Sequence, residues 1–435
     1  MCTIKIQNLG PIKNVEFNLN RVNIITGPQC SGKSTIAKVV SCCSWIEKDV
    51  IRRQMTSHVT RDFFVEKLFV YHQLNDYPLH KDVLIEYYGD AVSIKYTYDS
   101  FEIIKVDSFE QKSLGKIAYL PAERNIAALE NIESLQLPEI NIRGYLWEWF
   151  SIRSKYTETN PLQLFSIGVK YYYIKDKGDF ILLENGQSIP FNAASSGLQS
   201  VTPLYAYMSY ITSWIYQNRE DESYEKLGVL KKAMAMNVFQ SKLKNEGFKV
   251  SEDVVEHNIE DDTLEAIDRI VQNVRKYSEQ DLAKLDDQIK TMFELEKRLS
   301  RPHYSRIILE EPEMNLFPQS QIDLVYDILK MVNVSRDSLF INTHSPYILY
   351  ALNNCMLGGL LKDNIDDDEL LIHKESFIHP TNVSVWELRD GEFSSKQDNE
   401  EKTIQDARGL IRNNYFDRVM QNVMADFHCL MNYYD

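Results

Sequence analysis

The sequence predicts an α/β protein built on a mixed sheet, with an antiparallel side sheet and helical insertions. A strand-like apolar run at residues 22–26 leads into the glycine-rich stretch GPQCSGKST, after which apolar residues recur three and four apart. Residues 63–106 alternate in the manner of antiparallel strands. Short apolar runs at residues 305–309 and 338–343 have the length and composition of buried parallel strands.

Residues 1–131 are predicted to form a first lobe. Strands are expected in CTIKI, VEFNL and RVNIITG, followed by a helix that begins inside the glycine-rich stretch. The apolar face of that helix would carry residues spaced three and four apart: Ile36, Val39, Val40, Cys43, Ile46 and Val50. The alternating region then forms an antiparallel meander, and KIAYL is a short strand that ends at Pro121.

The next two segments are a helical insertion at residues 132–165 and a hairpin with its helix at residues 166–217. YLWEWF is the helix candidate of the insertion. The hairpin combines VKYYYI with DFILLENGQSIPF, where Asn185-Gly186 is expected to supply the positive φ angles of a type I′ turn. AASSGLQS follows directly and opens a helix that runs to about residue 217.

Residues 218–302 are predicted to be a second helical insertion. Their apolar spacing slips between Val274 and Leu282, which favours two helices over one long coiled coil. Packing on the chain's own body and a seam between molecules fit this pattern equally well. Residues 303–435 complete the domain with the two buried strands, a strand pair around LRDGEF, and helices in EKTIQDARGLIRNNYF and DRVMQNVMADFHCLMNYY.

The composition is that of an ordinary folded protein with an acidic surface. The hydrophobic fraction is 44% and the charged fraction 26%. A net charge of -15 disfavours a general nucleic-acid surface, although a local basic patch is compatible with it. The six cysteines include no CxxC pair, and no uninterrupted apolar stretch reaches about 18 residues. A cytoplasmic protein without a membrane span or structural zinc is expected.

Residues 27–35 match the GxxxxGK[ST] pattern of a phosphate-binding loop. Gly27 and Gly32 let the backbone wrap so that N–H groups face phosphate oxygens, and the helix N-terminus adds positive potential. Lys33 is expected to reach the β- and γ-phosphates, and the Ser34 hydroxyl to bind Mg²⁺. Thr35 completes the nucleotide-binding set. ATP and Mg²⁺ are therefore the predicted cofactors.

Two later elements point to the same phosphates. Glu310 and Glu311 end the strand IILEE, and strand ends beside a P-loop are where ligands collect in a doubly wound sheet. Glu310 suits Mg²⁺, and Glu311 suits orienting or deprotonating the attacking water; a solvated acidic turn is the alternative. His344, after the strand FINT, would contact the γ-phosphate, the alternative being a packed or turn-forming histidine.

Five motifs in this order resemble the ABC-type ATPase heads. The resemblance is to the RecF/SMC/Rad50-like and OLD-like branch, often catalogued among bacterial phage-defence ATPases. The motifs are IKIQNLGPIKNVEFNLNRVNIITGPQCSGKST, YLPAERN, AASSGLQS, IILEEPEMNLFP and INTHSP, spread from residue 3 to about residue 346. The resemblance implies a P-loop ABC-type head that binds and hydrolyses ATP.

The resemblance also implies that two copies share each ATP. SSGLQ is similar to the signature motif, so Ser196, Gly197 and Gln199 would meet the γ-phosphate held by the other subunit. The alternative is a purely structural role in which Ser196 caps its helix, and the two roles are compatible. PEMNLFP is similar to the loop that touches the partner's site, which makes Asn315 a candidate interface residue. A head-to-tail homodimer, or a higher homo-oligomer, is implied.

Three features depart from the family pattern. YLPAERN stands where ABC proteins carry a glutamine loop; Glu123 and Arg124 leave a Mg²⁺ contact there in doubt, and Arg124 is expected to pair with phosphate or with a core acid. The insertion at 218–302 follows the signature instead of preceding it, so long-range DNA tethering is not expected. Cys30 lies within the P-loop, either as a tolerated small spacer or as a thiol beside the phosphates whose alkylation would block ATP binding.

A nuclease within the same chain is not predicted. OLD-like nucleases carry a C-terminal Toprim domain with acidic metal ligands. The cluster resembling it here is DNIDDDELL, with Asp366 and Asp368, and a solvated loop explains that cluster better.

The resemblance leaves two main functions open. The first is an ATP-driven switch of a bacterial anti-phage system, similar to the ATPase subunits of PARIS or Septu, which restrains a separate nuclease or toxin until a phage-derived trigger acts. The second is a RecF-like DNA repair or maintenance ATPase that binds duplex DNA. The acidic charge favours a protein partner over nucleic acid. A transporter head is a third, weaker option.

Overall fold

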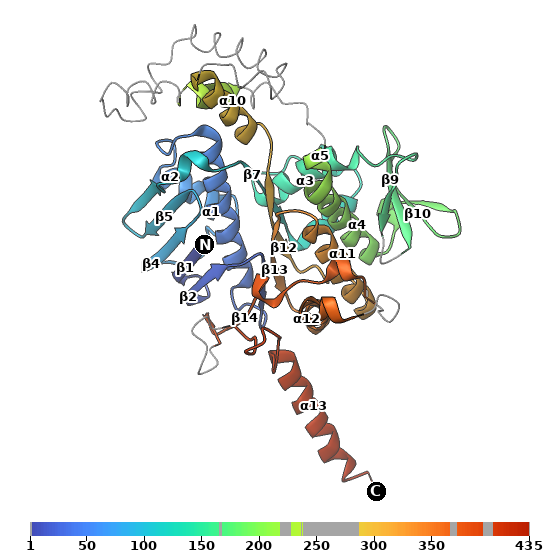
Figure 1. Ribbon diagram of the computed structural model, residues 1–435. Coiled ribbons are helices and arrows are strands. Elements are labelled where there is room, and N and C mark those ends of the chain that lie inside the picture. Colours follow the sequence, from blue (N-terminus) through green and yellow to red (C-terminus); the bar gives the residue numbers. More distant parts are fainter. Residues whose placement is uncertain are drawn as a thin grey trace.

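A mixed sheet of eleven strands forms the centre of the protein, as the computed structural model shows (Figure 1). The structure describes residues 2–164, 168–217, 228–235, 237, 287–365, 372–394 and 403–434. Five strands pair in parallel, in the order β14 (Val383–Arg389), β3 (Val22–Thr26), β13 (Ser338–Thr343), β12 (Tyr304–Glu310) and β7 (Gly115–Leu120). This half carries the glycine-rich loop.

The other half of the sheet is antiparallel. Its order is β6 (Phe101–Lys105), β5 (Val92–Thr97), β4 (Leu79–Tyr88), β1 (Cys2–Leu9) and β2 (Ile12–Leu19), and β15 (Glu392–Phe393) joins the two halves. A separate antiparallel sheet contains β11 (Ser188–Pro190), β10 (Gly178–Leu182), β9 (Val169–Ile174) and β8 (Leu162–Leu164). The predicted fold class is confirmed.

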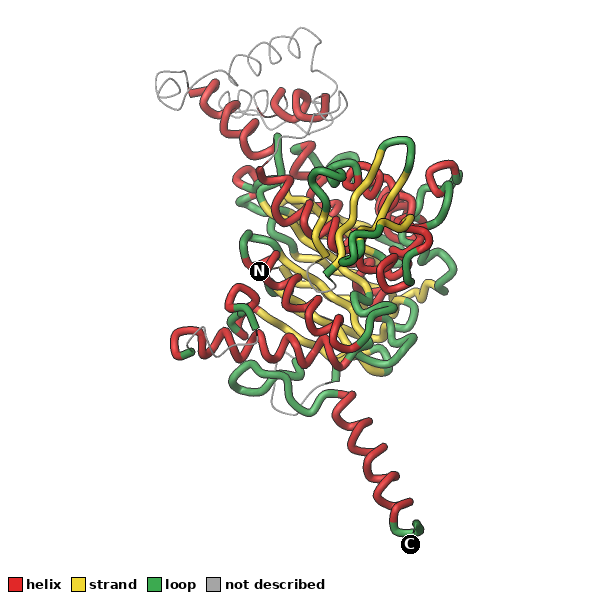
Figure 2. Tube along the Cα trace, turned by 90° about the vertical axis from the view of Figure 1, so that its right-hand side faces the viewer, coloured by secondary structure: helices red, strands yellow, loops and turns green. Residues whose placement is uncertain are grey.

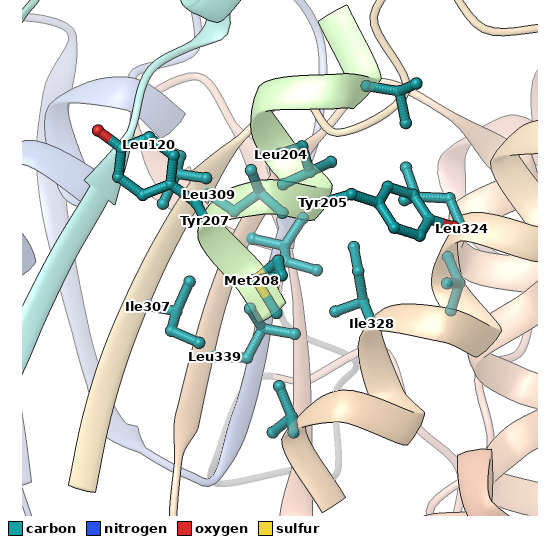
Figure 3. Close-up of a cluster of buried hydrophobic side chains, with 14 of the residues drawn as sticks. Leu120, Leu204, Tyr205, Tyr207, Met208, Ile307, Leu309, Leu324, Ile328 and Leu339 are labelled. Carbon is teal, nitrogen blue, oxygen red and sulfur yellow. The ribbon is translucent and has the colours of Figure 1, made fainter. Parts of the chain in front are cut away.

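Helices cover both faces of the parallel half because its strands are apolar on both faces. Alternate residues of β12 divide between two cores, with Ile307 and Leu309 in one and Ile308 in the other. Helix α1 (Lys33–Arg53) packs on the face of Ile308. The opposite face is covered by α3 (Asn141–Arg153), α4 (Ser196–Ser209), α11 (Pro318–Asn333) and α12 (Pro346–Leu361). Figure 3 shows α4 side chains packed against strand residues on that face.

The turn predicted at Asn185-Gly186 is wrong in type. Gly186 has a φ of 82°, but Asn185 is not among the described residues with positive φ. The Asn185 side chain instead accepts a hydrogen bond from the backbone N–H of Gln187 (3.0 Å). The backbone N–H of Gly186 donates to Leu183 O (2.9 Å), so the loop is one residue longer than a type I′ hairpin turn.

The helix predicted in EKTIQDARGLIRNNYF is also wrong, because residues 403–414 are irregular. Side chains of this segment accept hydrogen bonds from backbone N–H groups that would otherwise bond within a helix. Asp406 Oδ1 accepts from two later backbone N–H groups, including that of Leu410 (3.0 Å). Gln405 Oε1 accepts from Val385 N of β14 (3.0 Å), as a neighbouring strand would. The helix begins only after Asn414, which caps it.

Helix α13 (Tyr415–Met431) projects from the rest of the described structure (Figures 1 and 2). None of its residues is buried, and its apolar side chains include Phe427, 54% exposed, and Leu430, 69% exposed. The helix therefore presents an uncovered apolar face. Among the helices of the described residues, none has the length and apolarity needed to cross a bilayer.

Most of the insertion at 218–302, including the predicted slip in register, lies outside the described residues, as do Asp366 and Asp368. Its described end, α10 (Asp287–Leu299), places Leu295 and Leu299 in the core that contains α1. At this end the insertion packs on its own chain.

Glu47 ties α1 to the antiparallel half of the sheet, and its removal should destabilise the protein. Its buried carboxylate accepts from the hydroxyl of Tyr87 (2.6 Å) and the N–H of Ala91 (2.7 Å). Glu47→Ala would leave both donors without their acceptor, so we expect the free energy of unfolding to fall by about 2–4 kcal/mol. Urea unfolding measures this, with the exposed Glu66→Ala as control; equal losses in both variants would contradict the assignment.

Candidate functional site

The register of three parallel strands brings the predicted chemistry to one edge of the sheet. Thr26 pairs with Thr343, and Glu310 pairs with Asn342. The glycine-rich loop follows β3, the two acids end β12, and His344 follows β13. Because parallel strands end on the same side, all three segments meet there.

The glycine-rich loop has a backbone that only glycine allows at two positions. Gly27 has a φ of 148° and Gly32 a φ of 103°. A Cβ on Gly27 would lie 2.1 Å from Leu388 O, and one on Gly32 would lie 2.4 Å from Ile12 Cδ1. Helix α1 then starts with no side-chain cap and no acid in its first turn. Its first N–H groups are thus suited to an anion.

Lys33 lies folded into the loop. Its ammonium donates to the carbonyl oxygens of Gly27 (2.9 Å) and Pro28 (2.6 Å). Burial lowers the pKa of Lys33 to about 8, while the nearby Glu311 and Glu313 favour its charged form. The cation is therefore held at the centre of the loop, beside the acids.

Glu310 is buried, only 5% exposed, and its Oε1 has no hydrogen-bond partner among the described residues. Burial raises its pKa to about 7, against the opposing effects of Lys38 and of the Tyr119 and Ser34 hydroxyls. Such a carboxylate with an unpartnered oxygen, next to the exposed hydroxyl of Ser34, fits Mg²⁺, which prefers oxygen ligands. Within the described residues no three His, Cys, Asp or Glu side chains gather to bind a metal, so phosphate and water would supply the remaining ligands.

Glu311 and His344 lie side by side. The distance from His344 Nε2 to Glu311 Oε1 is 3.5 Å, and both side chains are about one-third exposed. Glu311 has a φ of 44°, a strained value for a residue other than glycine. Burial and Lys33 lower the pKa of His344, while Glu311 raises it. A neutral imidazole beside a carboxylate is thus available near the loop.

Two polar residues at this edge of the sheet were not predicted from the sequence to belong to the site. Glu313 Oε1 accepts from Thr343 Oγ1 (2.9 Å) and from His344 N (2.6 Å), so it links the acidic turn to the histidine turn. Asn342 is buried, and neither atom of its amide has a partner among the described residues. Asn342 could have been recognised from the sequence as a polar residue inside an apolar strand. For Glu313 the sequence offered only its place in the motif IILEEPEMNLFP.

Arg124 is not paired with a core acid among the described residues, and its buried donors face backbone carbonyl groups where a phosphate contact was the other alternative. The fully buried guanidinium donates to the backbone oxygens of Glu310 (2.9 Å), Glu311 (2.8 Å) and Pro312 (3.1 Å). It also reaches Ser200 O on α4 (3.0 Å). The turn after β12 buries carbonyl groups that need donors, and one arginine supplies them. Burial lowers the pKa of this arginine.

The segment similar to a signature motif opens helix α4. Ser195, not Ser196, is the N-cap, since its hydroxyl accepts from the N–H of Leu198 (3.4 Å), so the N-cap alternative for Ser196 is wrong. Ser196 is the first helical residue and is exposed. A Cβ on Gly197 would lie 2.8 Å from Asn315 O, which requires a small residue there.

The structure does not place this segment at the glycine-rich loop of its own chain. Helix α4 packs on the face of the sheet opposite α1, and no described contact joins Ser196 to the loop. The side-chain amide of Gln199 donates within its own turn, to Asn192 O (2.9 Å) and Ala194 O (3.1 Å). The loop, both acids and His344 are therefore together, whereas Ser196, Gly197 and Gln199 are apart from them.

No protein family matches this chain in the family comparison. No curated protein matches it either. Among solved structures, the SMC head domain from Thermotoga maritima is 8% identical over 80% of this chain and 90% of that chain, with a TM-score of 0.33. The recombination mediator protein RecF is 11% identical over 90% of this chain and 96% of that chain, with a TM-score of 0.29. A dimeric bacterial ABC transporter cassette is 11% identical over 90% and 96%, with a TM-score of 0.25.

The raised pKa of Glu310 predicts a pH dependence of stability in metal-free protein. A carboxyl with a folded pKa near 7 and an unfolded pKa near 4.5 costs the folded state stability as pH rises through that window. Glu310→Gln removes the charge, so we expect it to become more stable than wild type by up to about 3 kcal/mol at pH 8, with little difference below pH 4.5. Denaturant unfolding in chelator measures this. Parallel pH profiles for the two proteins would contradict the burial of the carboxyl.

Proposed function

We propose that this chain is an ATP-hydrolysing ABC-type head that closes on a second copy around shared ATP. The observation that carries the proposal is the meeting of Lys33, Glu310, Glu311 and His344 at one strand edge, while Ser196 lies exposed elsewhere. One chain thus has a phosphate loop, a metal-binding acid and a water-orienting pair. A group that closes on the γ-phosphate would come from the partner.

The chain's own groups have separable roles in this proposal. Lys33 exchanges the carbonyls of Gly27 and Pro28 for phosphate oxygens, a charge-assisted interaction. Ser34 and Glu310 would hold Mg²⁺, which supplies positive charge at the β- and γ-phosphates when bound. Glu311, paired with His344, orients the attacking water in line with the γ-phosphate.

Closure of two copies fits the exposed start of α4. Its N–H groups, beginning at Ser196, could reach a partner's phosphate, as helix N-termini reach anions. The loop at Asn315, which has a φ of 61°, contacts Gly197 in the same chain. A movement of the acidic turn would therefore displace the signature segment. Loss of the γ-phosphate would then open the interface.

As the biological role of this ATP-driven switch, we favour the control of a separate nuclease or toxin in anti-phage defence. The support is the motif order, the net charge of -15 and the uncovered apolar face of α13, which suits a protein partner better than DNA. A RecF-like ATPase on duplex DNA shares the same motif order and is the second candidate. A salt-sensitive gel shift with duplex DNA would favour it, and co-purification with a neighbouring nuclease would favour the first.

Substitutions in the loop and at the second acid should separate binding from hydrolysis. Lys33→Ala removes the cation that meets the phosphates, so ATP affinity should fall at least about tenfold. Glu311→Gln keeps the loop intact but removes the water-orienting carboxylate, so it should bind ATP normally and accumulate as a closed dimer.

Nucleotide binding by calorimetry and mass by light scattering, each with ATP and Mg²⁺, measure these outcomes. Glu16→Gln, an exposed substitution on β2, is the matched control for Glu311→Gln. Equal ATP affinity in Lys33→Ala and wild type, or normal turnover in Glu311→Gln, would refute the proposed site.

A further inference from the structure

A pocket of about 730 Å³ lies beside the P-loop helix, apart from the phosphate loop itself. Its walls are α1, the segment around the π-helical turn η1 (Glu66–Val70), β7 and α3. Figure 1 shows α1 and α3 on either side of β7. The volume is in the range of pockets that hold cofactor-sized molecules.

The charge of this pocket is opposite to that of the chain. Four cationic side chains line it, Lys48, Lys67, Lys116 and Arg143, against two acidic ones, Glu139 and Glu148, in a protein of net charge -15. Ion pairs join Lys67 to Glu139 (3.8 Å) and Lys116 to Glu148. The excess of positive charge favours an anionic ligand.

Aromatic rings accompany these cations. The Arg143 guanidinium lies 4.7 Å from the ring centroid of Trp147, and the Lys48 ammonium lies 5.3 Å from that of Trp45. Trp147 is 64% exposed, which is unusual for so large an apolar side chain. Planar rings beside cations are the surface that nucleobases and phosphates recognise together.

The pocket also contains a buried polar atom that lacks a partner among the described residues. His72 is 2% exposed, and its Nδ1 has no hydrogen-bond partner among the described residues, while its ring packs against that of Tyr119. The two rings are in edge-to-face contact, 5.2 Å between centroids. Buried polar groups of native proteins are normally satisfied, so such atoms point to a ligand or water. Burial lowers the pKa of His72 to about 3, which leaves its ring neutral.

We propose that this pocket binds a nucleoside phosphate, with its base on Trp147 or Trp45 and its phosphate beside Arg143 and Lys48. The nucleotide is additional to the ATP of the glycine-rich loop. It could be a free molecule or the terminal nucleotide of a single strand, since both offer the same chemistry. His72 provides a hydrogen bond at the floor.

Occupancy would reach the ATP site by two short routes. Trp45 and Lys48 lie on α1, the helix that begins at the phosphate loop. Tyr119 pairs with Ile308 on β12, two residues before Glu310. A change in ATP turnover on binding is therefore expected, and this expectation alone rests on the proposed function.

The test measures binding without measuring ATP turnover. Lys33→Ala in the full chain removes the main phosphate ligand of the loop, and calorimetry then follows AMP, GMP, CMP and UMP and a 5′-phosphorylated single-stranded oligonucleotide. Binding of at least one probe, weakened about tenfold or more by adding Arg143→Glu or Trp147→Ala, is the expected result. Mononucleotide binding alone identifies a free ligand, and tighter binding of the oligonucleotide identifies a strand end.

Arg301→Glu, at an exposed position outside the pocket, is the matched control and should leave the affinity unchanged. Thermal unfolding of each variant separates lost binding from lost folding, and Trp147→Ala is chosen because that side chain is largely exposed. The proposal is overturned if no probe binds, or if folded Arg143→Glu and Trp147→Ala bind as tightly as their parent. Neither of these two results would bear on the proposed ATP site.

Discussion

The parallel pairing of β3, β13 and β12 is the constraint on which the candidate site depends. A shift by one residue would turn Glu310 from the α1 side to the opposite face, because side chains alternate along a strand. The buried Arg124 reinforces this arrangement by donating to three successive carbonyl groups that begin at the last residue of β12, Glu310. Since the guanidinium also reaches Ser200 O, one side chain fixes the acidic turn relative to α4. The acidic residues of the candidate site and the signature segment are therefore held in fixed positions relative to each other.

Much of the fold could be predicted because its signals are local. The P-loop pattern, the alternation of the meander and the apolar strands each lie within a few residues of one another. The errors arose where side chains compete with backbone hydrogen bonds, as at Asn185 and Asp406. The roles of Arg124 and Glu313 depend on neighbours far away in sequence, and no spacing rule could have shown them.

Strain and unpaired groups accumulate at the same edge. Cys30, Glu311 and Asn315 all have positive φ without being glycine, with φ angles of 58°, 44° and 61°. Glu310 and Asn342 bury polar atoms without partners within the described part of the chain. A protein that needed only a stable core would have little reason to keep these features together. They fit a site that is completed by nucleotide, metal and a second copy.

The most direct measurement of the central claim is ATP turnover by a mixture of two inactive variants. Lys33→Ala keeps its signature segment but lacks the phosphate cation, whereas Ser196→Arg keeps its loop but blocks the surface offered to a partner. If two copies share each site, neither variant should turn over ATP alone, while an equal mixture should regain roughly a quarter of the wild-type rate, since half of random dimers carry one intact site. A mixture as inactive as its components, or full activity of Ser196→Arg alone, would contradict the account.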